Sequence, residues 1–139
     1  MDAFDADVLI YAAADTPEGA RVIHLSDAAL EAGSSLGVGS VLLLAETLTR
    51  PLRHQDDVEE RRIAALLGQL VLHPCDAATA MSAVDLGARY GLRALDAVHL
   101  ATAVRAGADR FITNNRRDFS KDIDEIAVTY PEDLDESAD

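Results

Sequence analysis

The sequence predicts one α/β domain in which a central parallel sheet is covered by helices on both faces. Short apolar segments alternate with longer helical patterns along the whole chain, and parallel neighbouring strands need a crossover that is usually a helix. A chain of 139 residues has the usual length of one domain with a substantial core. No linker, repeat or low-complexity segment interrupts residues 1–139, so we expect a single domain.

The first segment, residues 3–14, is a short and mostly apolar stretch with acids set into it, AFDADVLIYAAA, and we expect a strand followed by a turn. Thr16 and Pro17 suit a helix N-cap with proline in the first turn. Apolar residues at helical spacing then predict an amphipathic helix over residues 17–32, which ends at Gly33.

The middle of the chain continues this alternation. SLGVGS, residues 35–40, is typical of a second short strand. Ser40 is a suitable N-cap for a helix that runs from Val41 to the break at Arg50 and Pro51.

A third unit follows. Asp56 or Asp57 can cap a helix that extends to Leu70, and VLHP at residues 71–74 is typical of a brief strand stopped by its proline. The next helix is expected over residues 77–90, with a glycine directly after it.

The last part of the chain contains its most apolar helical pattern. LRALDAVHLATAVRAG, residues 92–107, predicts a helix that stops at its final glycine. DRFITNN, residues 109–115, predicts a strand that leaves the core and meets a polar turn, and IAVTY, residues 126–130, supplies one last strand.

The net charge of −13 argues against a protein whose whole surface attracts nucleic acid, because phosphate binding rests on clustered Lys and Arg. Carboxylates that bind a metal ion lose this repulsion when the cation arrives. Five of the acids lie in residues 131–139, PEDLDESAD, which we expect to form a solvated acidic tail.

Membrane and secretory segments are not evident. No apolar run reaches the roughly 18 residues of a membrane span, and the N-terminus carries Asp2, Asp5 and Asp7 where a secretory signal has basic residues. We therefore expect a cytoplasmic protein with no membrane partner. Cys75 is the only cysteine, so it forms no disulfide within the chain and is expected to fill the core.

Three acids occupy positions where folding alone favours apolar residues. They are Asp5 in the first apolar segment, Glu46 within LLLAETL and Asp96 within LRALDAVHLA. A buried lone carboxylate is costly unless it is paired or bound to a cation. Strand ends and helix starts meet at one edge of an open α/β sheet, so these acids can converge there and bind a divalent cation such as magnesium.

Each of these acids also has a simpler explanation. Asp96 could cap its helix, Glu46 could face water, and Asp5 could belong to an ordinary turn at a strand end. Their occurrence at corresponding places in successive units favours a shared metal site.

The sequence resembles the PIN-domain family, and within it the VapC-like toxins, through three segments that span nearly the whole chain. They are FDADVLIYA, SVLLLAETL and LRALDAVHLATAVRAGADRFITNNRRDF, in that order. The resemblance implies a three-layer domain and a ribonuclease site that depends on Mg²⁺ or Mn²⁺. It further implies the toxin of a type II toxin-antitoxin pair, a small antitoxin protein as its partner, and paired subunits.

The resemblance assigns roles residue by residue. Asp5, Glu46 and Asp96 match the three acids of the family motif, so they are the expected catalytic and metal-binding residues. Asp5 and Asp96 would hold the metal, while Glu46 would either complete its coordination or orient the attacking water. Asp7 stands where a polar residue often supports the site.

One position departs from the family pattern. The fourth acid commonly follows two residues after the threonine at the end of the fourth strand, and here Asn115 occupies that place after Thr113. We expect Asn115 to position other groups, and Asp118 is a candidate further metal ligand, with an ordinary polar residue before Phe119 as the simpler explanation.

Basic residues are densest just after this strand. Arg116, Arg117 and Lys121 are candidates for contacts to the RNA backbone, although solvated charge is the simpler explanation for them. His99 lies three residues after Asp96 on roughly the same helical face. Hard cations prefer oxygen ligands, so we expect this histidine to be hydrogen-bonded inside the domain.

Other classes of function share parts of this pattern. Asp5 and Asp7 have the spacing of phosphatases with an aspartate nucleophile, but those proteins have a threonine where this chain has Leu9, and the only lysine, Lys121, follows a polar turn. A phosphate-accepting receiver domain also needs a lysine at a late strand end, so the single lysine counts against it. A different class is a PIN-like binding module with a weakened site that acts through protein or RNA contacts. Asn115 is the feature that keeps this alternative open.

Overall fold

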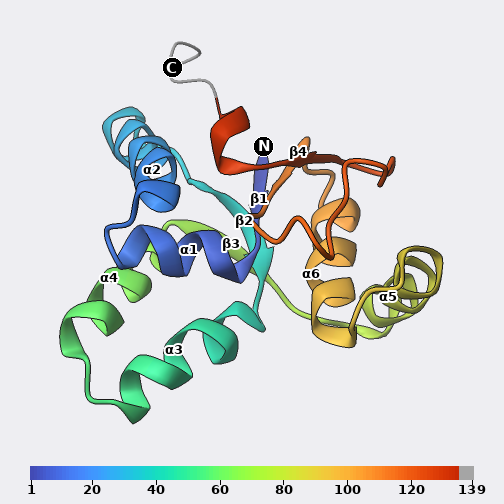
Figure 1. Cartoon of the computed structure of the whole chain (residues 1–139), viewed down its shortest axis with the longest axis horizontal. Coiled ribbons are helices and arrows are strands. Elements are labelled where there is room, and N and C mark those ends of the chain that lie inside the picture. The colour runs from blue at the N-terminus through green and yellow to red at the C-terminus, as the bar shows by residue number, and fades with distance from the viewer. Residues whose placement is uncertain (135–139) are drawn as a thin grey trace.

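The computed structural model describes residues 1–134, which form three layers with a five-stranded parallel sheet in the middle (Figure 1). The strand order is β3-β2-β1-β4-β5, and all four neighbouring pairs are parallel. The strands are β1 (Asp2–Phe4), β2 (Gly37–Ser40), β3 (Leu70–His73), β4 (Arg110–Ile112) and β5 (Ala127–Thr129). This architecture confirms the fold class expected from the sequence.

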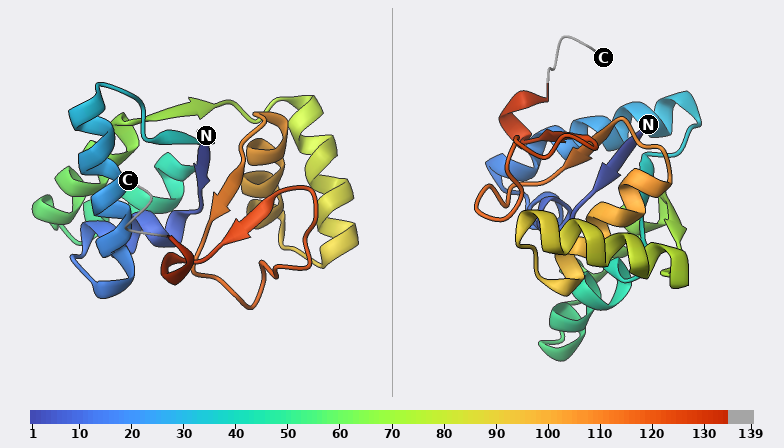
Figure 2. Two further views of the ribbon diagram at one scale, coloured as in Figure 1. Left: turned by 90° about the horizontal axis from the view of Figure 1, so that it is seen from above. Right: turned by 90° about the vertical axis from the view of Figure 1, so that its right-hand side faces the viewer.

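Helices cover both faces of the sheet, and Figure 2 shows the two groups on either side of the strands. One group packs with the core that contains Phe4, and the other packs with the core that contains Phe111. The first group is α1 (Ala6–Ala13), α2 (Ala20–Ala32), α3 (Leu43–Arg53) and α4 (Asp57–Gly68), and the second is α5 (Ala77–Tyr90) and α6 (Ala94–Arg105). Two short 3₁₀ helices, η1 (Pro17–Gly19) and η2 (Pro131–Asp133), complete the elements of the described chain.

Successive side chains of a strand point alternately into one core and the other. Ala3 and Phe111 face α5 and α6, while their neighbours Phe4 and Ile112 face the α1 side. Successive residues of a strand point to opposite faces of a sheet. The short apolar strands are therefore buried on both faces, as expected of a parallel sheet between two helical layers.

The expectation of a strand through residues 3–14 was wrong beyond Phe4. Asp5 adopts extended backbone angles and accepts a hydrogen bond from the backbone N–H of Ala6, so it caps a helix, α1, that runs from Ala6 to Ala13. A short apolar run cannot be assigned to strand or helix by periodicity alone. Residues 6, 8, 9, 12 and 13 are buried, and this is the spacing of one face of a helix. Packing of that face against the core therefore selects the helix.

Helix α3 also differs from its expected bounds. It begins at Leu43, because the hydroxyl of Ser40 accepts from the N–H of Leu42 and forms a turn before the helix. It then continues through Pro51 to Arg53. Proline inside a helix loses one backbone hydrogen bond, but the ring of Pro51 is buried, and this burial offsets the loss.

The helices α2 and α5 end as expected at Gly33 and Gly91, which both have φ of 67°. This left-handed conformation carries little strain for glycine. Asp56, one of the two residues expected to cap α4, accepts from the N–H of Glu59 at 3.0 Å. Within the described chain, none of the helices is both long enough and apolar enough to cross a membrane.

The first residues of the expected acidic tail are part of the packed fold, which corrects that expectation. Pro131 is buried in η2 and Leu134 is only 3% exposed. Arg21 donates hydrogen bonds to the carbonyl oxygens of Glu132 and Leu134. Residues 135–139, the remainder of the expected tail, lie outside the described residues.

Candidate metal centre

The candidate site lies at the carboxyl ends of β1 and β4, which are neighbours in the sheet. The chain leaves β1 toward β2 and β3 on one side, and β4 and β5 lie on the other side. Helices that follow strands on opposite sides leave a crevice at such a reversal, where ligands bind in open α/β sheets. Asp5 follows β1 directly, and Thr113 follows β4.

Asp5 is held at this edge of the sheet by three hydrogen bonds. Its backbone N–H donates to the carbonyl of Ile112 at 2.9 Å, and its Oδ1 accepts from the N–H of Ala6 at 2.8 Å. Its Oδ2 accepts from the hydroxyl of Thr113 at 2.7 Å. The residue is only 4% exposed. Burial, followed by the charge of Asp7, raises the pKa of Asp5 to about 7.

Thr113 joins Asp5 to the loop after β4. Besides donating to Asp5, its Oγ1 accepts from the backbone N–H of Asn115 at 3.0 Å. Thr113 is fully buried, so both hydrogen bonds are shielded from water. Thr113 thus contacts the carboxylate of Asp5 directly, whereas Asn115 is linked to Asp5 through the hydroxyl of Thr113.

Asp7 is near enough to two other acids of the site to interact with their charges. Its carboxylate accepts from the backbone N–H of Asn114 at 3.1 Å and 3.3 Å. Burial raises its pKa, and the negative charges of Glu46 and Asp96 raise it further. The charges of these carboxylates therefore interact, and Asp7 belongs to the same electrostatic cluster.

Asp96 reaches the cluster from the first turn of α6, on the other face of the sheet. Its pKa is raised first by partial burial and then by the charges of Asp118 and Glu46. Arg93, which precedes α6, and His99 act in the opposite direction without cancelling the shift. Acids from the strand end, α3, α6 and the loop after β4 therefore meet in one region.

Asn115, which stands where the resemblance led us to expect a fourth acid, is hydrogen-bonded to Asp118. The side-chain amide of Asn115 donates to Oδ2 of Asp118 at 3.0 Å, and the backbone N–H of Asp118 donates back to Oδ1 of Asn115 at 3.2 Å. These paired hydrogen bonds fix the turn between the two residues. Asn115 thereby holds the carboxylate of Asp118 near enough to Asp96 to raise the pKa of Asp96.

Glu46 contacts His99, a pair that no sequence pattern indicated directly. His99 Nε2 lies 2.5 Å from Oε1 of Glu46, and the imidazole is 1% exposed. His99 Nδ1 is buried and has no hydrogen-bond partner among residues 1–134. The expectation of a histidine hydrogen-bonded inside the domain is met at only one of its two nitrogens. The position of His99 on the helical face of Asp96 was the available hint.

The donor atoms of this site fit a hard divalent cation. They are carboxylate oxygens, and burial, followed by repulsion between the acids, raises the pKa values of Asp5, Asp7 and Asp96. Within residues 1–134, no three acidic, histidine or cysteine side chains are placed so that they could hold a metal ion as they stand, so side chains of the site would have to move together to bind one. Magnesium is typically held by one or two carboxylates together with several water molecules, so an open acidic crevice suits it.

The basic residues after β4 are less available than the sequence suggested. Arg116 pairs with Glu132 and lies over the ring of Tyr130, with its guanidinium carbon 4.7 Å from the ring centroid. Lys121 pairs with Asp133 at 2.7 Å and also lies against Tyr130. Arg117 is exposed and forms no ion pair within the described part of the chain.

Comparisons with known proteins agree with this fold. A family model described as the PIN domain matches residues 3–124. The chain is 25% identical to a chain in a toxin-antitoxin complex from Klebsiella pneumoniae, with a TM-score of 0.71. That alignment covers 94% of this chain and 98% of the other. No curated protein matches the chain at a significant level.

The raised pKa of Asp5 predicts how stability changes with pH in the metal-free protein. The folded state holds this proton up to about pH 7, whereas the unfolded chain releases it near the ordinary value of 3.8. The free energy of unfolding therefore falls as pH rises from about 4 to about 7, by up to about 4 kcal/mol from Asp5. Urea unfolding in EDTA at several pH values measures this slope.

Asp5→Asn mimics the neutral form and should flatten that dependence. Asp7 and Asp96 contribute slopes of the same sign, because their pKa values are also raised, so some dependence should remain. An identical slope in wild type and Asp5→Asn would contradict the buried, repelled state of Asp5.

Magnesium should raise the melting temperature of the wild type, because a ligand bound only by the folded state stabilises it. At a hundred times its dissociation constant the gain is about 2.7 kcal/mol. Asp96→Asn should reduce this gain and should also raise the melting temperature of the metal-free protein, because it removes a repelled charge. Thermal unfolding with and without MgCl₂ measures both effects.

Asp85→Asn is a matched control for that measurement, because Asp85 is exposed on α5 and shows no contact with the acidic cluster. It should respond to magnesium as the wild type does. An undiminished magnesium gain in Asp96→Asn would show that the cation binds elsewhere.

Proposed function

Because the chain belongs to the PIN domain family, we propose that it is a Mg²⁺- or Mn²⁺-dependent endoribonuclease and the toxin of a type II toxin-antitoxin pair. PIN domains are generally nucleases that use divalent metals. The observation that carries the proposal is the buried Asp5 at the strand ends, with a pKa raised by burial and by the charge of Asp7, beside further acids that interact with one another. The stability of the fold does not explain why carboxylates lie together there, because buried like charges destabilise a protein.

In this proposal Asp5 and Asp96 bind the cation, and Asp118 is a further ligand held in place by Asn115. When bound, the cation makes a water molecule more acidic and neutralises charge on the scissile phosphate. Glu46 either completes the coordination or orients that water, and Asp7 adds charge beside it. Thr113 keeps the carboxylate of Asp5 in one orientation, because its hydroxyl donates to Oδ2.

Arg116, Arg117 and Lys121 are the proposed contacts to the RNA backbone. Arg117 is the first of these to engage a phosphate, because it is exposed and has no acidic partner within the described residues. Arg116 and Lys121 would exchange Glu132 and Asp133 for phosphate oxygens. Exposed ion pairs are weak enough for such an exchange. The reaction takes place where cellular RNA is found, in the cytoplasm.

Purified protein with Mn²⁺ should cleave RNA, and Asp5→Asn, Glu46→Gln and Asp96→Asn should each lower the rate by roughly a hundredfold or more. Gel analysis of total cellular RNA measures cleavage, with EDTA as the metal-free reaction. Asp85→Asn should cleave like the wild type, because its carboxylate lies on the exposed face of α5.

The alternative is a PIN-like binding module, and the replacement of an acid by Asn115 is the observation in its favour. A wild type that leaves RNA intact with both Mn²⁺ and Mg²⁺ would support that alternative. Cleavage that survives unchanged in Asp5→Asn would instead place the active site elsewhere.

An antitoxin is the proposed partner, and a similar chain is found in a toxin-antitoxin complex. A crevice that contains Asp5, Glu46 and Asp96 suits an arginine side chain in place of a metal ion. Charge-assisted hydrogen bonds from a guanidinium to carboxylates are among the strong ones. We infer that the antitoxin inhibits by placing such a residue among these acids.

Expression with and without the neighbouring gene tests this partnership in cells. The wild type should arrest growth only when expressed alone, and Asp5→Asn should never arrest it. Growth that is unaffected in every combination, together with a lack of RNA cleavage in vitro, would remove both the toxin and the nuclease proposals.

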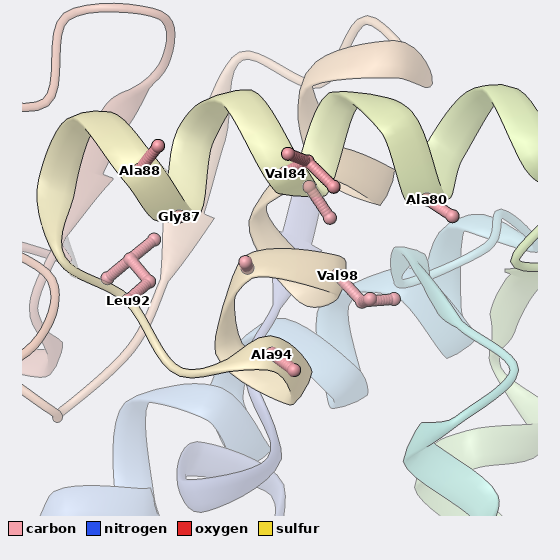
Figure 3. A pocket seen from close by; sticks show the side chains of 9 residues that line it. Ala80, Val84, Gly87, Ala88, Leu92, Ala94 and Val98 are labelled. Atoms are coloured by element: carbon pink, nitrogen blue, oxygen red, sulfur yellow. The ribbon is translucent and has the colours of Figure 1, made fainter.

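A homodimer is proposed through α5 and α6. An apolar groove runs between these helices, and Figure 3 shows Ala80, Val84 and Ala88 of α5 facing it together with residues of α6. Met81 and Val84 on α5 are 64% and 60% exposed. Apolar patches of this kind mark association surfaces, and a second copy gives a closed, self-complementary contact.

Static light scattering at tens of micromolar should therefore report a dimer. Val84→Glu should shift the protein to monomer, because a buried unpaired charge opposes association. Val58→Glu is the matched control, since Val58 is 49% exposed on α4 in the other helical layer. A monomeric wild type, or equal effects of both substitutions, would contradict this interface.

A further inference from the structure

His99 is the one buried titratable side chain of the site that the proposed reaction leaves without a role. It lies one turn after Asp96 in α6, and its imidazole is 1% exposed. Nε2 is 2.5 Å from Oε1 of Glu46. Nδ1 is buried and has no hydrogen-bond partner among residues 1–134.

The surroundings of His99 show which of its nitrogens forms a hydrogen bond. A carboxylate oxygen accepts, so Nε2 donates to Oε1 of Glu46. Nδ1 has no partner within the described residues, so the contact with Glu46 is the hydrogen bond that orients the imidazole.

This hydrogen bond connects two helices that otherwise pack elsewhere. Helix α3 packs mainly against α4 and α1, whereas α6 packs against α5 and β2, on the other side of the sheet (Figure 1). His99 and Asp96 lie on the same side of α6, three residues apart. The bond therefore fixes the carboxylate of Glu46 with respect to the helix that carries Asp96.

A purely structural role does not explain His99 well. A buried imidazole nitrogen without a partner costs free energy, and an apolar side chain of similar size would fill the same space without that cost. Stability alone would favour leucine at this position. The hydrogen bond to Glu46 is the contact that leucine could not make.

We propose that His99 is a positioning residue of the metal site, whose Nε2–H holds Oε1 of Glu46 and leaves the second carboxylate oxygen free to act beside Asp96. The inference rests on the proposed function, because it assigns Glu46 to cation binding. Side chains that orient metal ligands by hydrogen bonds affect affinity strongly.

Mn²⁺ affinity, measured by electron paramagnetic resonance of the free ion, tests this role. His99→Leu should weaken binding by about tenfold or more while the melting temperature of the metal-free protein stays the same or rises. His99→Gln places an amide N–H close to the position of Nε2, so it should recover most of the lost affinity. In a Glu46→Gln background, His99→Leu should cause no further loss, because the residue acts through Glu46.

Equal affinity in His99→Leu and wild type would overturn the inference, and so would a folded His99→Gln that binds as weakly as His99→Leu. Additive losses in the double variant would also overturn it. A wild type that binds no Mn²⁺ overturns the proposed function, and the inference with it, whereas loss of the inference alone requires a wild type that binds.

The hydrogen bond gives a second readout that needs no metal. Nitrogen-15 NMR of the metal-free protein should show a proton on Nε2 of His99. Glu46→Gln should change the Nε2 signal, because the acceptor is altered. An Nε2 without a proton in the wild type would contradict the proposed contact.

Discussion

The burial of Asp5 between the ends of β1 and β4 is the constraint on which the rest of the site depends. One carboxylate oxygen accepts from the first N–H of α1, and the other accepts from the hydroxyl of Thr113 after β4. The same side chain thus starts a helix, joins two strand ends and presents negative charge to the crevice. Its raised pKa shows that these hydrogen bonds do not offset the cost of burial and of repulsion by Asp7.

The site brings together the two helical layers that the sheet otherwise keeps apart. Glu46 comes from the layer of α3 and Asp96 from the layer of α6, and they meet only beyond the strand ends. Carboxylates from separate layers repel one another, so the arrangement must be maintained by specific hydrogen bonds. The contact between Glu46 and His99 and the pair of Asn115 with Asp118 provide them.

A strongly acidic protein repels RNA, so the proposed function needs local features that offset this repulsion. The net charge is −13, and the basic side chains of Arg116 and Lys121 are already paired with acids of η2. In the proposed function the cation lowers the negative potential of the crevice and so permits a phosphate to approach. Arg117 then contributes charge that no acid within the described residues neutralises. In the proposed function, a metal ion and an arginine of the antitoxin would compete for the same carboxylate oxygens.

The sequence by itself determined the alternation of strands and helices, because apolar spacing, glycine stops and aspartate caps act locally, as at Gly33 and Asp56. It also determined which acids are unusual, since Asp5 and Asp96 interrupt apolar segments. It could not decide whether residues 6–13 form a strand or a helix, because a short apolar run suits both until packing selects one. Only the tertiary structure placed Asp7 among the acids, bound Asn115 to Asp118 and brought His99 onto Glu46. These contacts join segments through the sheet topology, and their energies depend on distance and burial, which no local pattern encodes.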